Sequence, residues 1–263
     1  GQNLIKGINF DGLKVIGDPC EAAYNYFKDG ADEIFYDDIV ASLYDKTISE
    51  DIVKNTSKNI SIPMTVAGGI KSLKDIESLL NSGADKVAIN THAVKNPLFL
   101  KEASRHFGSQ CIVLSVHSKK IHNNYEIFTE NGRERTQLEL NEWVNKCADM
   151  DIGEIFLSSV DHEGLCKGLD KDLIINLKLN SLPLSYGGGV GNINHCLDFL
   201  TNHKVDGLFI ASAIHYYYYN NEFKNSYEKL NREGFNDLKP FSIFELKKKL
   251  DKNQINVRLD ANL

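Results

Sequence analysis

Residues 62–72, Ile-Pro-Met-Thr-Val-Ala-Gly-Gly-Ile-Lys-Ser, return as residues 182–192, Leu-Pro-Leu-Ser-Tyr-Gly-Gly-Gly-Val-Gly-Asn. The two copies lie 120 residues apart, and Glu33-Ile34-Phe35 returns 121 residues later as Glu154-Ile155-Phe156. Solenoid units recur at roughly 20 to 50 residues, so this spacing is too long for a solenoid. We therefore expect a duplicated half-domain, and the contents of each copy predict which fold was duplicated.

Short apolar runs alternate with longer amphipathic stretches in the second half of the chain. The runs typical of strands are 111–116, 154–160, 182–186 and 207–211, and the helical patterns between them include 137–148 and 193–200. This alternation predicts a parallel sheet built of βα units. Four such units, duplicated, predict an α/β fold: a (β/α)8 TIM barrel in a single domain over 1–263, with half-barrels at about 1–107 and 108–263.

The first half shows only three strand-like runs, at 33–39, 64–66 and 86–89. The partner of 111–116 falls before Gly1, so the first barrel strand is apparently missing from this sequence. A barrel that lacks a strand exposes two unpaired edges. We therefore expect about ten further residues at the N-terminus of the natural chain; the alternative is a seven-stranded open barrel.

Composition excludes several classes of protein. The net charge of −6 argues against a nucleic-acid partner, because such proteins carry basic faces. No apolar run reaches the roughly 18 residues of a membrane span. Five cysteines without a C-x-x-C pair indicate reduced thiols in a cytoplasmic protein. Eight histidines without ligand spacing predict no metal site, and nothing indicates a cofactor. We expect the run 216–219 to begin an aromatic-rich helix on the barrel rim.

Two glycine turns predict where a ligand binds. Gly68-Gly69 ends one strand and Gly188-Gly189 ends its counterpart, and glycine lets an anion approach the backbone. The next strand in each half ends in a small or polar pair. We call Gly68, Gly69, Asn90 and Thr91 the first anion site, and Gly188, Gly189, Ala211 and Ser212 the second. Tight turns also need glycine, but the repetition favours a substrate with a phosphate at each end.

A series of motifs resembles the HisF family, the cyclase subunits of imidazole glycerol phosphate synthase. The motifs span nearly the whole chain: 6–10 (Lys-Gly-Ile-Asn-Phe), 17–19 (Gly-Asp-Pro), 30–33 (Gly-Ala-Asp-Glu), 38–42 (Asp-Ile-Val-Ala-Ser), 83–91 (Gly-Ala-Asp-Lys-Val-Ala-Ile-Asn-Thr), 107–110 (Phe-Gly-Ser-Gln) and 256–259 (Asn-Val-Arg-Leu). The related HisA isomerases share the duplication but lack Gly108-Ser109-Gln110 and the Asn-Val-Arg-Leu tail. The resemblance implies a lyase that uses ammonia from a HisH-like glutaminase docked at the bottom of the barrel. It converts a bis-phosphorylated ribulosyl aminoimidazole carboxamide nucleotide to imidazole glycerol phosphate, for histidine biosynthesis.

The resemblance also implies a charged ring that gates the ammonia path at the bottom of the barrel. Glu33, Lys86 and Glu154 match three members of this ring, and each lies at the start of a strand. Buried charges persist only when they are paired, which suits a Glu-Lys-Glu arrangement. The alternative is a set of ordinary salt bridges on the rim.

The catalytic positions depart from the family in one place. The family uses two aspartates, one falling before Gly1 and one at His117, as general acid and base. Histidine titrates near pH 6.5, so His117 is able to exchange protons at neutral pH. Asp161, a second catalytic candidate, ends the sixth strand. The family match further assigns substrate binding to Lys6, Asp38 and Glu163, and Ala67 replaces the first of three glycines.

Three functions remain open at this point. The first is the HisF-type cyclase, and the second is an ammonia conduit whose cyclase activity has lapsed. The conduit would serve a sugar amidotransferase in surface-polysaccharide synthesis, since some HisF relatives have that role. The third and weakest is a HisA-like sugar isomerase. An aspartate about four positions before Gly1 would favour the cyclase.

Overall fold

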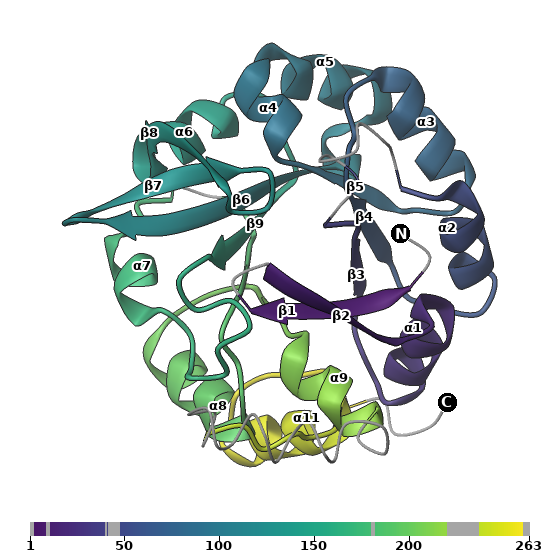
Figure 1. Ribbon diagram of the computed structural model, residues 1–263, viewed down its shortest axis with the longest axis vertical. Helices are drawn as coiled ribbons and strands as arrows, with labels where there is room; N and C mark the ends of the chain where they lie inside the picture. Colours follow the sequence, from purple (N-terminus) through teal and green to yellow (C-terminus); the bar gives the residue numbers. More distant parts are fainter. Residues whose placement is uncertain are drawn as a thin grey trace.

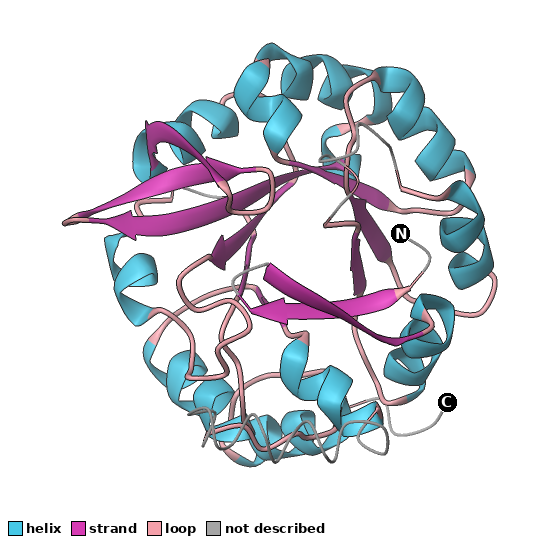
Figure 2. Cartoon of the chain, viewed as in Figure 1, coloured by secondary structure: helices cyan, strands magenta, loops and turns pink. Residues whose placement is uncertain are grey.

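A computed structural model describes residues 3–8, 11–39, 41, 48–179, 182–219 and 237–259. Strands form an inner ring, and helices surround it on the outside (Figure 2). This is the arrangement of a (β/α)8 TIM barrel, as the sequence predicts.

Seven parallel strands make up the wall of the barrel. In spatial order they are β11 (Gly207–Phe209), β10 (Leu184–Gly187), β9 (Glu154–Ser159), β6 (Ile112–Ile121), β5 (Lys86–Ile89), β4 (Met64–Ala67) and β3 (Ile34–Asp37). Within the described residues, no strand pairing joins β3 to β11. The expected N-terminal strand stays a prediction, because its residues would precede Gly1.

The helices follow the strands in turn and form the outer layer (Figure 1). They are α1 (Pro19–Lys28), α2 (Glu50–Ser57), α3 (Leu73–Asn81), α4 (Thr91–Lys95), α5 (Leu98–Phe107), α6 (Leu140–Ala148), α7 (Lys171–Asn176), α8 (Ile193–Asn202), α9 (Ser212–Tyr218) and α11 (Ile243–Lys252). Local sequence sets their starts. Ser72, for example, accepts a hydrogen bond from Asp75 N, and the Asp75 carboxylate accepts one from Ser72 N. This capping box fixes the start of α3.

Matching hydrogen bonds occur in the two halves. Asp85 N donates to Met64 O (2.9 Å), and the Asp85 carboxylate accepts from Met64 N (2.8 Å). The same exchange joins Asp206 to Leu184 at 2.8 Å in both directions. In both half-barrels, therefore, the same pair of hydrogen bonds holds neighbouring strands together.

The hydrophobic core has two parts. The larger part packs between the strands and the outer helices. The smaller part fills the inside of the barrel and contains Ala67, Ala88, Val113 and Phe156, with Phe35 and Phe209 packed against it. The ring centroids of Phe35 and Phe156 lie 4.9 Å apart, edge to face. Side chains that alternate along a strand point to opposite faces, so Phe35 identifies the inward face of β3.

Two hairpins add to the barrel beyond what the sequence predicted. One joins β1 (Leu4–Ile8) to β2 (Asp11–Gly17) and crosses the ring in the view of Figure 1. The other extends β6 with β7 (Asn124–Thr129) and β8 (Glu134–Glu139). The predicted helix 137–148 therefore begins only at Leu140, because residues 137–139 belong to β8.

The tyrosine run lies at the end of α9, so the prediction that it starts a helix is wrong. Tyr216 to Tyr218 are the last residues of α9, and Tyr219 caps it. Tyr26 of α1 packs against this end and shares a 2.6 Å hydrogen bond with His215 Nδ1. The aromatic side chains thus join α9 to α1.

Candidate functional site

A pocket opens at the carboxyl ends of β3, β4, β5 and β6, the end of a TIM barrel that carries active sites. It brings together six of the predicted residues: Asp38, Gly68, Gly69, Asn90, Thr91 and His117. The other lining residues are Asp37, Ala67, Ile70, Lys71, Ala88, Ile89, His92, Lys95, Ser115, Glu130 and Asn131. The first anion site and the histidine at the catalytic position thus share one pocket.

The first glycine turn needs glycine for steric reasons. Gly68 has φ +124°, and a Cβ there would lie 2.8 Å from Asp38 O. Gly69 also has a positive φ of 66°. A side chain at Gly68 would collide with β3, so the turn brings bare backbone to the pocket.

The second glycine turn repeats this geometry. Gly188 and Gly189 have φ of 99° and 97°, and a Cβ on Gly189 would lie 2.2 Å from Gly168 O. The nearest carboxylate is that of Glu163, whose Oε2 would lie 3.4 Å from a Cβ on Gly188. Glu163, which the family resemblance assigns to substrate binding, therefore lies beside the second glycine turn.

The residues that complete the two anion sites also match. Asn90 precedes α4 with φ −117° and ψ −83°, and Ala211 precedes α9 with φ −111° and ψ −74°. The residues that follow them, Thr91 and Ser212, begin those helices. Asn90 and Ala211 occupy equivalent positions 121 residues apart and have similar φ and ψ angles, although their side chains differ.

His117 is buried, with 5% of its surface exposed. Asn90 Nδ2 lies 3.2 Å from His117 Nδ1 and also donates to Phe128 O at 3.3 Å. Burial lowers the pKa of His117 to about 4. The expectation that it titrates near pH 6.5 is therefore wrong, because its cation would have to leave water; at neutral pH the imidazole is uncharged.

Asp161 makes contacts different from those of His117. Its Oδ2 accepts a hydrogen bond from Lys120 N (2.8 Å), where β6 runs into the hairpin, and it does not line the pocket. Asp38 is buried at the end of β3 and does line it. Lys6 lies in β1, and its side chain is outside the described part of the structure.

Several buried or pocket-lining residues escaped sequence reasoning. Asp170, 7% exposed and outside the pocket lining, accepts hydrogen bonds from Tyr125, from Ser159 Oγ and from Leu173 N in the first turn of α7. Glu130 N donates to Thr91 Oγ1 at 3.2 Å, so the hairpin reaches the first anion site. Asp37 lines the pocket beside Asp38. Asp37 follows the inward-facing Phe35 by two residues, so the alternation of side chains along β3 could have identified it.

The charged ring lies at the opposite, amino end of the strands. Lys86 Nζ is 2.8 Å from Glu33 Oε2 and 2.8 Å from Glu154 Oε2, and all three side chains are largely buried. Burial by itself lowers the pKa of Lys86, but hydrogen bonds from its ammonium to Glu154 and Glu33 raise it above its ordinary value. Lys86 therefore stays protonated. Phe156 lies next along the barrel axis, with Lys86 Nζ 6.0 Å from its ring centroid.

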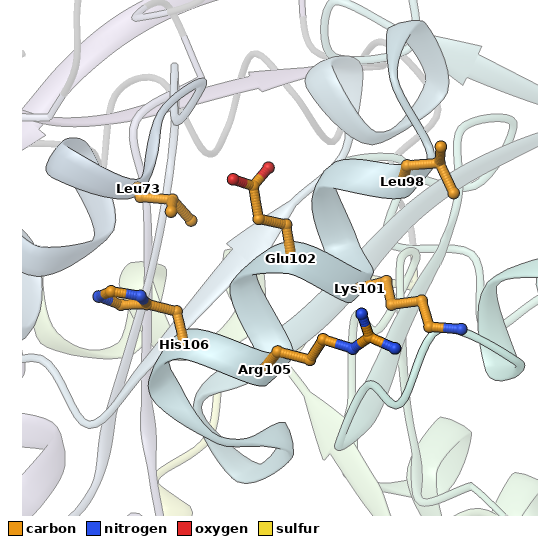
Figure 3. Close-up of a pocket in the computed structure, with 6 residues that line it drawn as sticks. All are labelled: Leu73, Leu98, Lys101, Glu102, Arg105 and His106. Carbon is orange, nitrogen blue, oxygen red and sulfur yellow. The ribbon is translucent and has the colours of Figure 1, made fainter.

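A second hollow lies on the outside of the barrel along α5 (Figure 3). Figure 3 shows its lining, which comes from α5 and the start of α3: Leu73, Leu98, Lys101, Glu102, Arg105 and His106. None of these residues lies at a strand end, so the hollow is separate from the site.

Two other features are absent from the described residues. No group of three or more His, Cys, Asp or Glu side chains is placed to hold a metal ion. No helix there combines the length and apolar character that crossing a bilayer requires. The five cysteines are all unpaired thiols.

Comparison with known proteins gives matches over most of the chain. Residues 2–220 match the family model described as "Histidine biosynthesis protein". A protein of Legionella pneumophila named imidazole glycerol phosphate synthase subunit HisF is 46% identical over 73% of this chain and 92% of its own length. Proteins of the same name from Natranaerobius thermophilus and Helicobacter hepaticus are each 40% identical, over 81% and 82% of this chain and 85% and 86% of their own.

Proposed function

The chain belongs to the HisF family, and from this premise we propose that it acts as the cyclase subunit of an imidazole glycerol phosphate synthase in histidine biosynthesis. The observation that carries the proposal is the extent of its identity with HisF subunits, which covers both halves of the barrel. The protein is then a lyase that acts within a glutamine amidotransferase complex. Its free thiols suit the reducing cytoplasm, where we place it.

The substrate we propose is the ribulosyl aminoimidazole carboxamide nucleotide with a phosphate at each end. Support comes from the two glycine turns, which repeat at an offset of 120 residues with similar backbone angles. Asn90 and Ala211 extend the likeness with closely matching φ and ψ. Two similar anion sites suit two similar charged ends.

The partner we propose is a HisH-like glutaminase at the amino end of the strands. The charged ring lies there, and ammonia released by the partner would enter past Lys86. Above the ring the barrel interior is apolar, lined by Ala67, Ala88 and Phe156. An apolar passage favours neutral ammonia over ammonium, since an unpaired ion in such surroundings is costly.

Complementation tests this proposal directly. A bacterial strain without its own HisF is given the full-length chain, on medium without histidine and with high ammonium to bypass the partner. Growth is expected. Failure to grow, with the folded protein present in the cells, would contradict the cyclase function.

One observation favours a second candidate, the ammonia conduit that serves a sugar amidotransferase. His117 stands where the family has aspartate, and burial keeps its imidazole neutral. The charged ring, in contrast, is intact in Glu33, Lys86 and Glu154. A conduit needs the ring but not the family's catalytic carboxylate.

Substitution at position 117 separates the two candidates. If the chain is a cyclase adapted to histidine, His117→Asp lowers turnover or leaves it unchanged. If it is a conduit, the unaltered chain is inactive on the nucleotide and His117→Asp produces activity. Asp51→Asn, at an exposed position of α2, serves as a control for loss of a carboxylate that does not line the pocket.

A further inference from the structure

Each glutamate of the charged ring is held at both of its carboxylate oxygens. Lys86 Nζ contacts one oxygen of each, at 2.8 Å from Glu33 Oε2 and 2.8 Å from Glu154 Oε2. Thr65 Oγ1 donates a hydrogen bond to the other oxygen of Glu33, and Ser185 Oγ donates to Glu154 Oε1 at 2.8 Å. Two uncharged residues, Thr65 and Ser185, therefore extend the ring at both ends.

The two contacts between a hydroxyl and a carboxylate are equivalent in the duplicated halves. Thr65 and Ser185 lie 120 residues apart, and Glu33 and Glu154 lie 121 residues apart. The hydroxyl residues occupy the neighbouring strand in each case, β4 beside β3 and β10 beside β9. Both halves form the same contact, with threonine in one and serine in the other, so the hydroxyl group is the feature that they share.

The halves differ at the position of the cation. Thr65 pairs in register with Lys86 of β5, and Ser185 pairs in register with Gly207 of β11. Gly207 thus occupies in the second half the position that Lys86 occupies in the first, and one lysine serves both carboxylates. A Cβ on Gly207 would lie 2.7 Å from Ser185 Oγ. The missing side chain therefore leaves room for the hydroxyl that reaches Glu154.

The hydroxyl groups restrict where the two carboxylates can lie. Thr65 is fully buried, and the exposed fractions of the Glu33, Lys86 and Glu154 side chains are 27%, 20% and 16%. Hydrogen bonds to an ionised group are stronger than those between neutral groups, and little water reaches the ring to replace a lost partner. A glutamate without its hydroxyl partner would keep only the contact with Lys86, and its carboxylate would be free to turn.

We infer that Thr65 and Ser185 are positioning residues of the charged ring, which hold Glu33 and Glu154 around the single ammonium group of Lys86. The inference rests on the proposed function, in which ammonia from the partner enters past this ring. The hydroxyl groups take no part in the chemistry, because they lie toward the amino ends of the strands and the pocket lies at the carboxyl ends. Their effect is to keep the ring closed, so that ammonia is retained in the barrel instead of escaping to solvent.

Two substitutions break the same contact in different ways. Ser185→Ala removes the hydroxyl group, whereas Gly207→Ala keeps it but brings a Cβ against its oxygen. Ser185→Thr retains a hydroxyl group at the same position. Ser104→Ala is the matched control, because Ser104 is a buried serine of α5 whose hydroxyl has no hydrogen-bond partner in the described part of the chain.

Two assays of the full-length chain are compared for each variant. In complex with a HisH-like glutaminase, the ratio of glutamine hydrolysed to product formed measures how well ammonia is retained. With saturating ammonium and no partner, kcat measures the chemistry alone. Ser185→Ala and Gly207→Ala should each raise the ratio by about threefold to tenfold, the effect of losing one hydrogen bond to a charged group, and leave kcat on ammonium unchanged. Ser185→Thr and Ser104→Ala should match the parent in both assays.

The outcomes separate this inference from the proposed function. Ratios equal to that of the parent in both Ser185→Ala and Gly207→Ala would overturn the inference and leave the proposed function standing. An equal fall of product formation from both ammonia sources would also overturn it, because that result indicates damage to the fold. No product from the unaltered chain with either source would overturn the inference together with the proposed function.

Discussion

Replacing Lys86 by methionine removes the only cation that the structure places between Glu33 and Glu154 within the described residues. Methionine keeps most of the length and apolar stem of lysine, so the change is mainly one of charge. Lys86 Nζ contacts both carboxylates at 2.8 Å, and the exposed fractions of the three side chains are 16–27%. The two glutamates would then face each other without a partner.

The expected loss of stability lies between two limits. Removing one partner of a fully buried ion pair costs about 3–5 kcal/mol, and exposed pairs contribute about 0–1 kcal/mol. Because this ring is buried but not fully, we expect Lys86→Met to lower the free energy of unfolding by about 2 kcal/mol at pH 7.5.

Two assays follow the variant. Urea unfolding at pH 7.5 measures stability, with Lys171→Met, which breaks an exposed pair with Asp198, as the matched control. In complex with the glutaminase, the ratio of glutamine hydrolysed to product formed measures how well ammonia is retained, and we expect it to rise. A variant as stable as the parent, with an unchanged ratio, would refute the assignment of the ring.

We also expect measurable effects from changes at Gly68 in the first glycine turn, at His117 and at Asp170. Gly68→Ala should destabilise the fold by about 2–4 kcal/mol and weaken nucleotide binding. Gly30→Ala, at φ +93° but with nothing within 4 Å of the new Cβ, should show only the backbone cost of about 1–2 kcal/mol. Equal losses in thermal unfolding would contradict the clash with Asp38. The pKa of His117 is about 4 in the folded chain and near 6.5 when unfolded, so its contribution to stability is present above pH 6.5 and lost as pH falls to 4, by at most about 3 kcal/mol. His117→Gln should flatten the slope of stability against pH relative to the parent. An unchanged slope would argue against burial of the ring. Asp170→Asn should cost about 2–3 kcal/mol, because Tyr125, Ser159 and Leu173 N all donate to this carboxylate, while Asp172→Asn on the same helix should be nearly silent in urea unfolding.

The barrel itself could be predicted because its signals are local or repeated. Apolar runs mark β5 and β9 to within one residue, and Pro63 and Pro183 align the halves. The β6–β7 hairpin was missed although Tyr125 and Ile127 alternate after a His122-Asn123 turn, a pattern that indicates a strand. It was missed because the following segment, 137–148, shows the spacing of apolar residues that predicts a helix.

The site was only partly predictable, for a different physical reason. Glycine turns and strand ends show in the sequence, so Gly68 and Gly188 could be identified. Asp170 could not, because its partners Tyr125 and Tyr186 come from distant segments. The low pKa of His117 depends on burial, which no local pattern reveals.

Product formation by the full-length chain tests the central claim most directly. The ribulosyl nucleotide and ammonium are incubated with the protein, and imidazole glycerol phosphate is measured by mass spectrometry. We expect this product, at a rate that depends on protein concentration and falls when Gly68 is replaced by alanine. Unchanged nucleotide with the folded protein would contradict the cyclase function, and product from His117→Asp alone would identify a conduit.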